Sequence, residues 1–525
     1  MDAPIPGWMV FPVIFAALYA SHFSLLRLPY YWDEAGYYIP AAWDFFRTGS
    51  LIPVTTLTNA HPPLPSVYLA LWWKLTGFVP EVTREAVLMV AAAALMAVWR
   101  LAQRLAGTGE VAFWTVVLTG LYPVWFAQST LAHADIFAAA CTLWGMVYAL
   151  PEEEKKPRIA AAWFMAAALC KETSIVVPMT LAAIEIVEGF RAAPAIRRRC
   201  WAEAAWLAGA IVPLLGWYAW HFAKTGFVFG NPEFLRYNAQ ANLEPLRVLA
   251  AFGHRLLNLF AHMNMFVPVL LTLAALMLKP KLDAHGQERP QISRKSMLRI
   301  SILLLMNALL FSVLGGALLT RYLLPMYPLV LVVAVSTFYR RVPLWHALAL
   351  LSAGAFVAGL FINPPYRFAP EDNLDYARVV RLQLAGIAQL NRRFPGSTVL
   401  SAWPVTDELT KPELGYVKTP YEVYRLENFT AEQIDRAAAE LGRYSTALVF
   451  STKYDPPNLL LSLGPRSEKL DQRYFGLHHD LAPEAIAVRL SGTLVWERED
   501  HGQWIALIRF NRQFEAEALP PDGRR

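Results

Sequence analysis

The sequence predicts a polytopic α-helical membrane protein with about eleven transmembrane helices and a C-terminal extracytoplasmic α/β domain. Two observations lead to this prediction. Hydrophobic residues make up 56% of the 525 residues and charged residues only 17%, which is more apolar than soluble chains of this length usually are. The apolar residues also gather into runs near the length that crosses a bilayer, roughly 17 to 25 residues, and these runs end near residue 362.

The first span is expected at residues 7–26. No basic region precedes it and no small-residue cleavage site follows it, so an uncleaved helix is expected. The apolar stretch 62–78 contains a Trp72-Trp73-Lys74 cluster and is interpreted as an interfacial or re-entrant helix. Further spans are expected at residues 85–106, 111–130, 133–150, 159–170, 174–187, 201–221, 256–278, 297–319, 322–339 and 344–362.

Basic residues fall in alternate loops, and short loops rich in Lys and Arg stay in the cytoplasm. The loops or span ends with these residues are therefore inside: Arg100, Arg104, Lys155, Lys156, Arg158, Arg191, Arg197 to Arg199, the stretch 279–299, Arg340 and Arg341. The other loops face the outer side. The charge beside the first helix, with Arg27 after it, argues for the reverse orientation of that helix, but the later loops outweigh it.

The composition changes at residue 363, where Pro364 and Pro365 break the chain and a more charged segment without a span follows. We therefore expect two domains, 1–363 in the membrane and 364–525 outside it. In the second, residues 372–393 and 431–441 have helical periodicity, and strands are expected at 398–402, 446–451, 485–496 and 504–510.

The formal net charge of +6 does not indicate a nucleic-acid partner. The basic residues are scattered in short clusters between apolar runs and form no continuous basic face. Cys141, Cys170 and Cys200 all lie in or beside hydrophobic segments, so no disulfide framework is expected.

The segment that follows the first span carries the strongest functional indication. Trp32-Asp33-Glu34 places two carboxylates at the mouth of a membrane helix, where charged groups are costly and usually functional. The predicted outer loops and their flanks also contain His61, Asp135, Lys171 and Arg321. The candidate chemistry therefore gathers on one predicted face of the membrane.

These residues resemble the membrane GT-C glycosyltransferases, in particular the group of protein O-mannosyltransferases and lipid A aminoarabinose transferases. The resemblance covers residues 7–362. Many relatives have Lys where His61 stands, and aminoarabinose transferases commonly have Arg near Gly36, so the sugar stays open. Five motifs carry the resemblance: Trp32-Asp33-Glu34, His61-Pro62-Pro63-Leu64, His133-Ala134-Asp135-Ile136, Lys171-Glu172-Thr173 and Arg321-Tyr322-Leu323-Leu324-Pro325.

The resemblance implies an enzyme of the bacterial inner membrane that transfers a sugar from a polyprenyl-phosphate carrier to an outer acceptor with inversion. Asp33 would act as general base toward the acceptor hydroxyl, and Glu34 would orient Asp33 or the sugar. Lys171 and Arg321 would neutralise the leaving phosphate, with a hydrogen bond from His61. The long outer loop 222–255 is expected to act as a lid or acceptor wall.

Simpler interpretations are open for each residue. Asp33 and Glu34 would also cap a helix that begins at Ala35. Asp135 would complement a helix dipole, bind the acceptor or, with Asp33, hold a divalent metal; Lys171 would snorkel at a helix end. No cofactor is certain. As a function, a transporter or flippase of a lipid-linked glycan is the alternative, although it should show charges midway along spans or inverted repeats.

Overall fold

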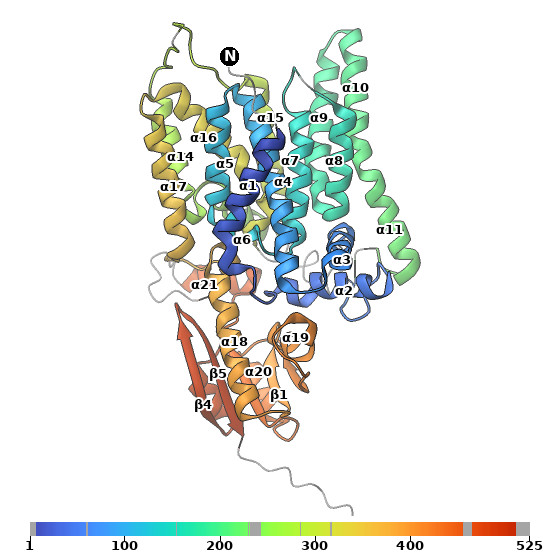
Figure 1. Cartoon of the computed structure of the whole chain (residues 1–525), viewed down its shortest axis with the longest axis vertical. Coiled ribbons are helices and arrows are strands. Elements are labelled where there is room, and N and C mark those ends of the chain that lie inside the picture. The colour runs from blue at the N-terminus through green and yellow to red at the C-terminus, as the bar shows by residue number, and fades with distance from the viewer. Residues whose placement is uncertain are drawn as a thin grey trace, which may run out of the picture. The chain divides into compact units, whose positions relative to one another are not determined.

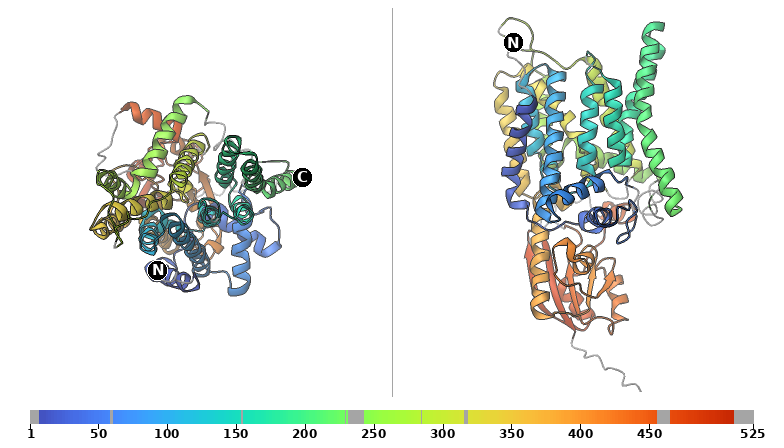
Figure 2. Two further views of the ribbon diagram at one scale, coloured as in Figure 1. Left: turned by 90° about the horizontal axis from the view of Figure 1, so that it is seen from above. Right: turned by 45° about the vertical axis from the view of Figure 1, so that its right-hand side comes forward.

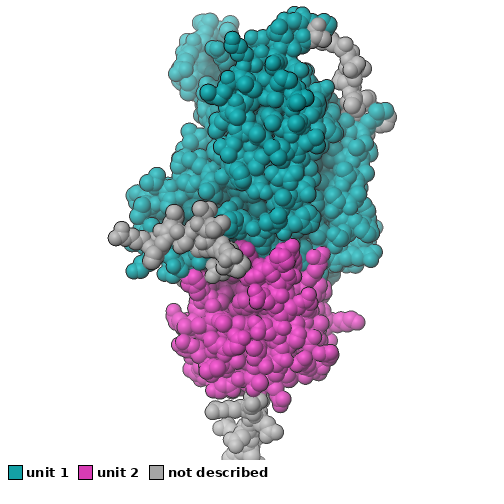
Figure 3. All heavy atoms as spheres, turned by 90° about the vertical axis from the view of Figure 1, so that its left-hand side faces the viewer, with its two compact units in different colours: residues 1–377, 460–477 teal, residues 378–459, 478–525 magenta. Residues whose placement is uncertain are grey.

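The computed structural model describes residues 7–58, 61–153, 155–228, 230, 243–283, 285–314, 318–454 and 465–510. It divides into two compact units, residues 1–377 with 460–477 and residues 378–459 with 478–525 (Figure 3). The expected domains 1–363 and 364–525 stay predictions.

The first unit is a bundle of helices (Figure 1). Its helices are α1 Gly7–His22, α2 Ile39–Thr48, α3 Leu64–Thr76, α4 Pro80–Ala106, α5 Gly109–Leu121, α6 Pro123–Gln128, α7 Ala134–Ala149, α8 Pro157–Cys170, α9 Val176–Arg191, α10 Pro194–Ala208, α11 Val212–Thr225, α13 Pro245–Phe260, α14 Phe266–Leu276, α15 Arg294–Val313, α16 Tyr327–Arg341, α17 Trp345–Phe361 and α21 Pro465–Phe475. Short turns join them: η1 Phe23–Leu25, η2 Glu34–Tyr38, η3 Glu172–Ile175, η4 Gly209–Ile211, η6 His262–Asn264, η7 Thr320–Leu323 and η8 Pro370–Asp372.

Among the described residues, four helical segments are long and apolar enough to cross a membrane, or five if a bent pair counts as one span. Several further apolar helices are shorter, among them those at Gly109–Leu121 and Ala134–Ala149. The predicted helical, multi-pass architecture is confirmed. The predicted number of about eleven spans is not confirmed.

One expected span is wrong as a single helix. Residues 256–278 form the end of α13 and all of α14, which are bent by 96° relative to each other. Met263 and Asn264, between them, have left-handed φ angles of 46° and 67°. Two successive residues in that conformation cannot continue a right-handed helix, so the apolar run turns sharply although it contains no glycine there. Helix α13 also takes up part of the expected loop 222–255.

Helices α2 and α3 lie at one end of the bundle, and α3 lies beside α4 there (Figures 1 and 2). The predicted helix at 62–78 is thus present as α3, and its interfacial position stays a prediction. Helix α4 ends at Gly107, whose φ of 73° makes it a left-handed cap, and Thr108 then caps α5 by accepting a bond from the Val111 amide.

Basic residues from the loops predicted to face inside meet in a network with buried carboxylates. Nζ of Lys155 lies 2.6 Å from Oε1 of Glu185 on α9, and Nη2 of Arg299 on α15 lies 3.0 Å from the same oxygen. Arg199 on α10 pairs with Glu203 at 2.9 Å. The network lies in the C-terminal half of α9, whereas the N-terminus of α9 follows Lys171. The charges predicted to face inside therefore gather away from the candidate site.

The second unit contains a five-stranded mixed sheet in the order β2-β1-β3-β5-β4. Strands β1 and β3 are buried along their whole length. Neither is an edge strand, because β1 pairs in parallel with β2 and β3, and β3 also pairs antiparallel with β5. The elements are α18 Asp375–Arg393, which begins in the first unit, β1 Val399–Ala402, α19 Val405–Thr410, η9 Pro412–Leu414, β2 Val423–Leu426, α20 Ala431–Ala438, β3 Thr446–Phe450, α22 Pro483–Arg489, β4 Gly492–Asp500 and β5 Gln503–Phe510.

The expected strand 485–496 is wrong in its first half. That half forms α22, and β4 begins only at Gly492. Gly386 lets α18 pack closely on the sheet, because a Cβ there would lie 2.6 Å from Cδ1 of Ile505 and would force that side chain to shift. Strand β2 was not expected from the sequence. The α/β composition predicted for this part is confirmed.

Candidate active site

Asp33 is presented by an unusual turn of backbone. Trp32, directly before it, has a φ of 44°, and the π-helical turn η2 begins with the next residue. Bulky side chains rarely adopt this left-handed conformation, and strained residues of this kind are typical of functional sites. The side chain of Asp33 makes no capping bond to the turn. It pairs with Nη2 of Arg321 instead, so the capping interpretation does not describe this residue.

Asp135 and Lys171 meet because α7 and α8 are consecutive antiparallel helices. Asp135 lies in the first turn of α7, and Lys171 follows the last residue of α8. Each charge thus complements the dipole of its own helix end, and Nζ of Lys171 lies 2.5 Å from Oδ1 of Asp135. Gly145 allows the two helices to approach, since a Cβ on it would lie 2.4 Å from the ring of Phe164.

Arg321 connects the separate parts of the site. It lies in η7, just before α16, and is only 3% exposed. Besides its ion pair with Asp33, its Nε lies 3.2 Å from Oδ2 of Asp135, and its Nη1 lies 2.5 Å from both oxygens of Glu371 in η8. Three carboxylates from three segments therefore surround one guanidinium group.

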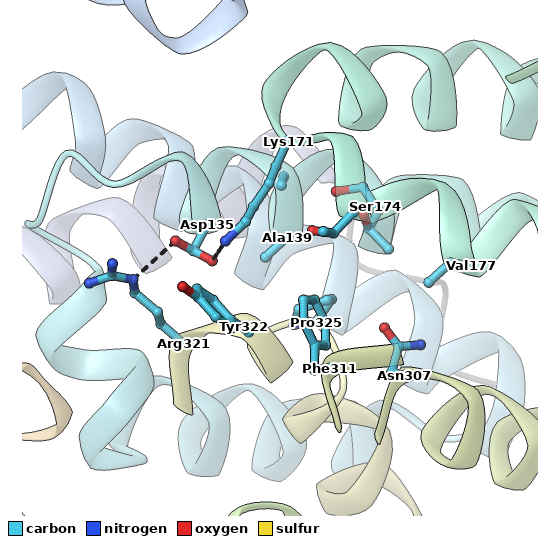
Figure 4. Close-up of a pocket in the computed structure, with 13 residues that line it drawn as sticks. Asp135, Ala139, Lys171, Ser174, Val177, Asn307, Phe311, Arg321, Tyr322 and Pro325 are labelled. Carbon is cyan, nitrogen blue, oxygen red and sulfur yellow. Dashed lines mark hydrogen bonds and ion pairs between the residues drawn. The ribbon is translucent and has the colours of Figure 1, made fainter. Parts of the chain in front are cut away.

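A small cavity opens beside this cluster. Figure 4 shows Asp135, Lys171 and Arg321 at one end and Val177 and Asn307 at the other. The walls between them are mostly apolar or aromatic. Nζ of Lys171 also lies 4.0 Å from the centre of the Tyr322 ring, a cation–π contact. The cavity is lined by Asp135, Ala138, Ala139, Thr142, Lys171, Thr173, Ser174, Val177, Asn307, Phe311, Arg321, Tyr322 and Pro325.

His61 lies close to the same cluster. Its Nδ1 is 2.8 Å from Oε2 of Glu172, the residue after Lys171, and its ring stacks on Tyr38. The centre of the Tyr38 ring also lies 5.7 Å from the centre of the His133 ring. Tyr38 therefore lies between His61 and the residues that begin α7. Glu172 thereby fixes the orientation of His61, and this partner was not expected from the sequence.

Glu34 does not line the cavity and is fully buried against Arg84 of α4. Its carboxylate accepts bonds from Nη1 of Arg84 at 2.8 Å, Nη2 of Arg84 at 3.0 Å, the Tyr31 amide at 2.8 Å and the Ala132 amide at 2.6 Å. Arg84 also donates to the carbonyls of Pro29 and Thr130. The pair ties the loop that carries Asp33 to the loop that precedes Asp135.

Exposure separates the carboxylates of the site. The side chain of Asp33 is 22% exposed, whereas those of Asp135 and Glu371 are 2% and 5% exposed and that of Glu34 is fully buried. Asp33 is therefore the carboxylate of the site most accessible from solution. Oδ2 of Asp135 accepts no hydrogen bond within the described parts of the chain, despite its proximity to Arg321.

Two residues of the cluster were missed by sequence reasoning. Arg84 directly precedes the expected span 85–106, and a lone basic residue at that position was the available signal. Glu371 follows the Pro364-Pro365 break and was assigned to the external domain. Burial raises the pKa of Glu371 to about 8, although Arg321 opposes that rise.

In the described residues, no three His, Cys, Asp or Glu side chains are close enough together to hold a metal ion. Asp33 and Asp135, the candidate metal ligands, instead share Arg321. Residues 231–242 of the expected lid are outside the described residues.

No known family model matches the chain, and no match is found among the curated proteins. Solved structures do match. ArnT from Cupriavidus metallidurans bound to undecaprenyl phosphate aligns over 95% of this chain and 98% of its own, with a TM-score of 0.56 and 14% identity. This chain has the ArnT fold.

The apo state of the same ArnT aligns with a TM-score of 0.52 and 13% identity, over 96% of this chain and 98% of ArnT. Arabinofuranosyltransferase AftD from mycobacteria aligns over 96% of this chain and 40% of its own, with a TM-score of 0.46 and 12% identity. A TM-score this low does not establish a shared fold. The expected resemblance to the GT-C membrane glycosyltransferases is thus confirmed at the level of the fold.

Proposed function

We propose that this chain is an inverting glycosyltransferase that moves a sugar from a polyprenyl-phosphate carrier to an extracytoplasmic acceptor. One observation carries the proposal: an apolar cavity between membrane helices ends at two buried cations, Lys171 and Arg321, next to a partly exposed carboxylate, Asp33. A lipid phosphate needs this combination, since its chain is apolar and its head is an anion. ArnT, which has this fold, was crystallised with undecaprenyl phosphate.

The residues fit the steps of such a transfer. Asp33 takes the proton of the acceptor hydroxyl as the hydroxyl oxygen bonds to C1 of the sugar. The bond from C1 to the phosphate oxygen breaks, and polyprenyl phosphate leaves with the electron pair. Lys171 and Arg321 stabilise the charge that grows on the leaving phosphate, so no general acid is needed. Attack opposite the leaving group inverts the configuration at C1.

The remaining residues support this arrangement. Asp135 positions Lys171 and Arg321 from between them, and its oxygen Oδ2, which accepts no hydrogen bond from the described residues, is suited to a sugar hydroxyl. His61, oriented by Glu172, adds a hydrogen bond to the phosphate. Glu34 acts through Arg84, as a positioning residue that holds the Asp33 loop.

The location belongs to the same proposal. About eleven spans in the bacterial inner membrane would place the cluster and residues 364–525 on the outer side, as the distribution of basic loops indicates. A transporter or flippase of a lipid-linked glycan, the alternative from the sequence, gains no support from the comparisons.

The test is sugar transfer by purified protein supplied with labelled polyprenyl-phosphate sugars and an extract of envelope acceptors. The wild-type chain should transfer label, and Asp33→Asn should lower the rate by about two to four powers of ten while still binding undecaprenyl phosphate. Asparagine keeps the shape of the side chain but cannot take a proton. Asp283→Asn, in a loop remote from the cluster, is the matched control and should retain full activity. Near wild-type transfer by Asp33→Asn would rule out Asp33 as the base.

A further inference from the structure

Glu371 has no part in the transfer just described, yet it is built into the centre of the site. Both its carboxylate oxygens lie 2.5 Å from Nη1 of Arg321, and its side chain is 5% exposed. It arrives from η8, after the last helix of the bundle, so the contact depends on tertiary structure alone. Its backbone carbonyl is held by Nε2 of Gln128 on α6 at 3.3 Å.

The charges of the cluster do not balance. With all groups ionised, Asp33, Asp135 and Glu371 give three negative charges against two positive charges from Lys171 and Arg321. In this fully ionised state, which Glu371 reaches only above about pH 8, the empty site is one charge negative. A lipid phosphate would add a further one or two negative charges in a region of low dielectric, where uncompensated charge is costly.

A proton on one carboxylate would remove the excess. Asp33 is the most exposed of the three, and Asp135 contacts both cations. Asp33 and Glu371 each contact Arg321 alone among the cations, through the guanidinium group that the phosphate needs. Glu371 is the more buried of the two and, unlike Asp33, has no role in the proposed proton transfer. It is therefore the carboxylate that the phosphate would displace.

We propose, building on the proposed function, that Glu371 positions Arg321 while the donor site is empty and takes up a solvent proton when the donor phosphate replaces it on the guanidinium. The step converts the carboxylate of Glu371 to a neutral carboxylic acid and leaves Arg321 paired with the phosphate. Glu371 thus acts through Arg321, as a positioning residue for the donor. Binding of the lipid phosphate is thereby coupled to pH.

The surroundings favour protonation of this side chain over the others. Burial is the largest influence and raises the pKa of Glu371 to about 8; Arg321 lowers it, and neighbouring carboxylates raise it further. A phosphate anion at Arg321 would raise it again. The ionisable groups that face Glu371 are Arg321 in η7, Asp33 and Tyr31 before η2, Asp135 and His133 at the start of α7, and Asp372 beside it in η8.

The direction of the pH dependence follows from these shifts. Below about pH 7 Glu371 already carries its proton in the free protein, so binding takes up none. Above about pH 8 the free protein must gain a proton on binding, and the affinity falls by up to about tenfold per pH unit. The lipid phosphate itself, with a second pKa near 6, is fully ionised above about pH 7.5 and adds no slope there.

The experiment measures binding of undecaprenyl phosphate to the full chain in lipid nanodiscs between about pH 7.5 and 9.5. For the wild type, Kd should rise about 20-fold over this range, and calorimetry in two buffers of different ionisation enthalpy should show uptake of nearly one proton at about pH 9. Glu371→Gln should bind with a Kd that changes less than about threefold and should take up no proton. The control Glu188→Gln, which alters a Glu–Arg pair elsewhere in the bundle, should keep the wild-type slope.

Each outcome decides the inference. Wild-type binding without a pH slope or proton uptake overturns it and leaves the proposed function standing. A wild-type slope in Glu371→Gln assigns the proton to another group and also overturns it. If Glu371→Gln does not fold, proton uptake by the wild type decides alone. Absence of undecaprenyl phosphate binding at every pH removes the proposed function, and this inference with it.

Discussion

The buried pair of Glu34 and Arg84 allows a test that separates a structural from a catalytic role. We expect Glu34→Gln to destabilise the whole bundle, and to lower activity only as far as folded protein is lost or the Asp33 loop shifts. The carboxylate of Glu34 accepts four hydrogen bonds, two of them from Arg84, and both side chains are fully buried.

The size of the effect follows from these contacts. The amide of glutamine has one acceptor oxygen and one NH₂ group. The NH₂ group would replace one carboxylate oxygen and would point a donor at the N–H groups that this oxygen now accepts from. About two charged hydrogen bonds are lost, at roughly 1.5 to 3 kcal/mol each. Arg84 also becomes an unpaired buried charge, for which removal of one partner typically costs about 3 to 5 kcal/mol. We therefore expect a loss of about 3 to 5 kcal/mol.

The assay is the thermal unfolding of purified variants in detergent, followed by tryptophan fluorescence and by loss of the monodisperse peak in size-exclusion chromatography. The double variant Glu34→Gln with Arg84→Met removes both charges and should recover much of the lost stability, since an apolar pair avoids the uncompensated charge. Glu85→Gln, next to Arg84 in sequence, serves as the matched control. A Glu34→Gln protein as stable as the wild type, but inactive, would refute the reasoning and make Glu34 a catalytic group.

Three further results are expected. Lys171→Ala should weaken undecaprenyl phosphate binding by at least about tenfold as well as slow transfer, because a cation already engaged in the ground state is lost; a change in rate alone would contradict this, and a lipid-binding titration measures it. Gly145→Ala should lower the unfolding midpoint, at a cost of about 1 to 3 kcal/mol, because its Cβ would overlap Phe164; an unchanged midpoint would show that the α7–α8 contact adjusts freely. Alkaline phosphatase fused after Gly464 should be active and the same enzyme fused after Gly189 inactive, because only the first would be exported; the reverse pattern would invert the map.

Much of the cluster could be predicted from the sequence because successive membrane spans alternate in direction, so every second helix end lies on the same side of the membrane. Asp33, Asp135, Lys171 and Arg321 all stand at ends of expected spans on the same side, and the structure brings these four into direct contact. Their roles in transfer stay proposals. A charged residue at the boundary of an apolar run can be recognised in the sequence, and the side of the membrane on which each boundary lies then determines which charged residues can meet.

Other parts of the fold and site depend on contacts that composition does not record. Glu371 belongs by composition to the polar C-terminal segment, yet it reaches Arg321 through tertiary structure. The bend at Met263 lies in an apolar run without glycine, and the one proline of that run, Pro268, stands after the bend, inside α14. Likewise, residues 485–496 have enough apolar and branched residues for a strand, but packing turns the first half into α22.

At position 32, the left-handed conformation of Trp32 lowers the stability of the fold while it holds the turn that the proposed activity needs. A bulky residue held at a φ of 44° costs about 1 to 3 kcal/mol, and glycine at position 32 would relieve it. The same substitution would free the turn that aims Asp33 at Arg321. Directed evolution that selects only for heat resistance should therefore find position 32 early and lose activity there, whereas selection for turnover should preserve the strained tryptophan.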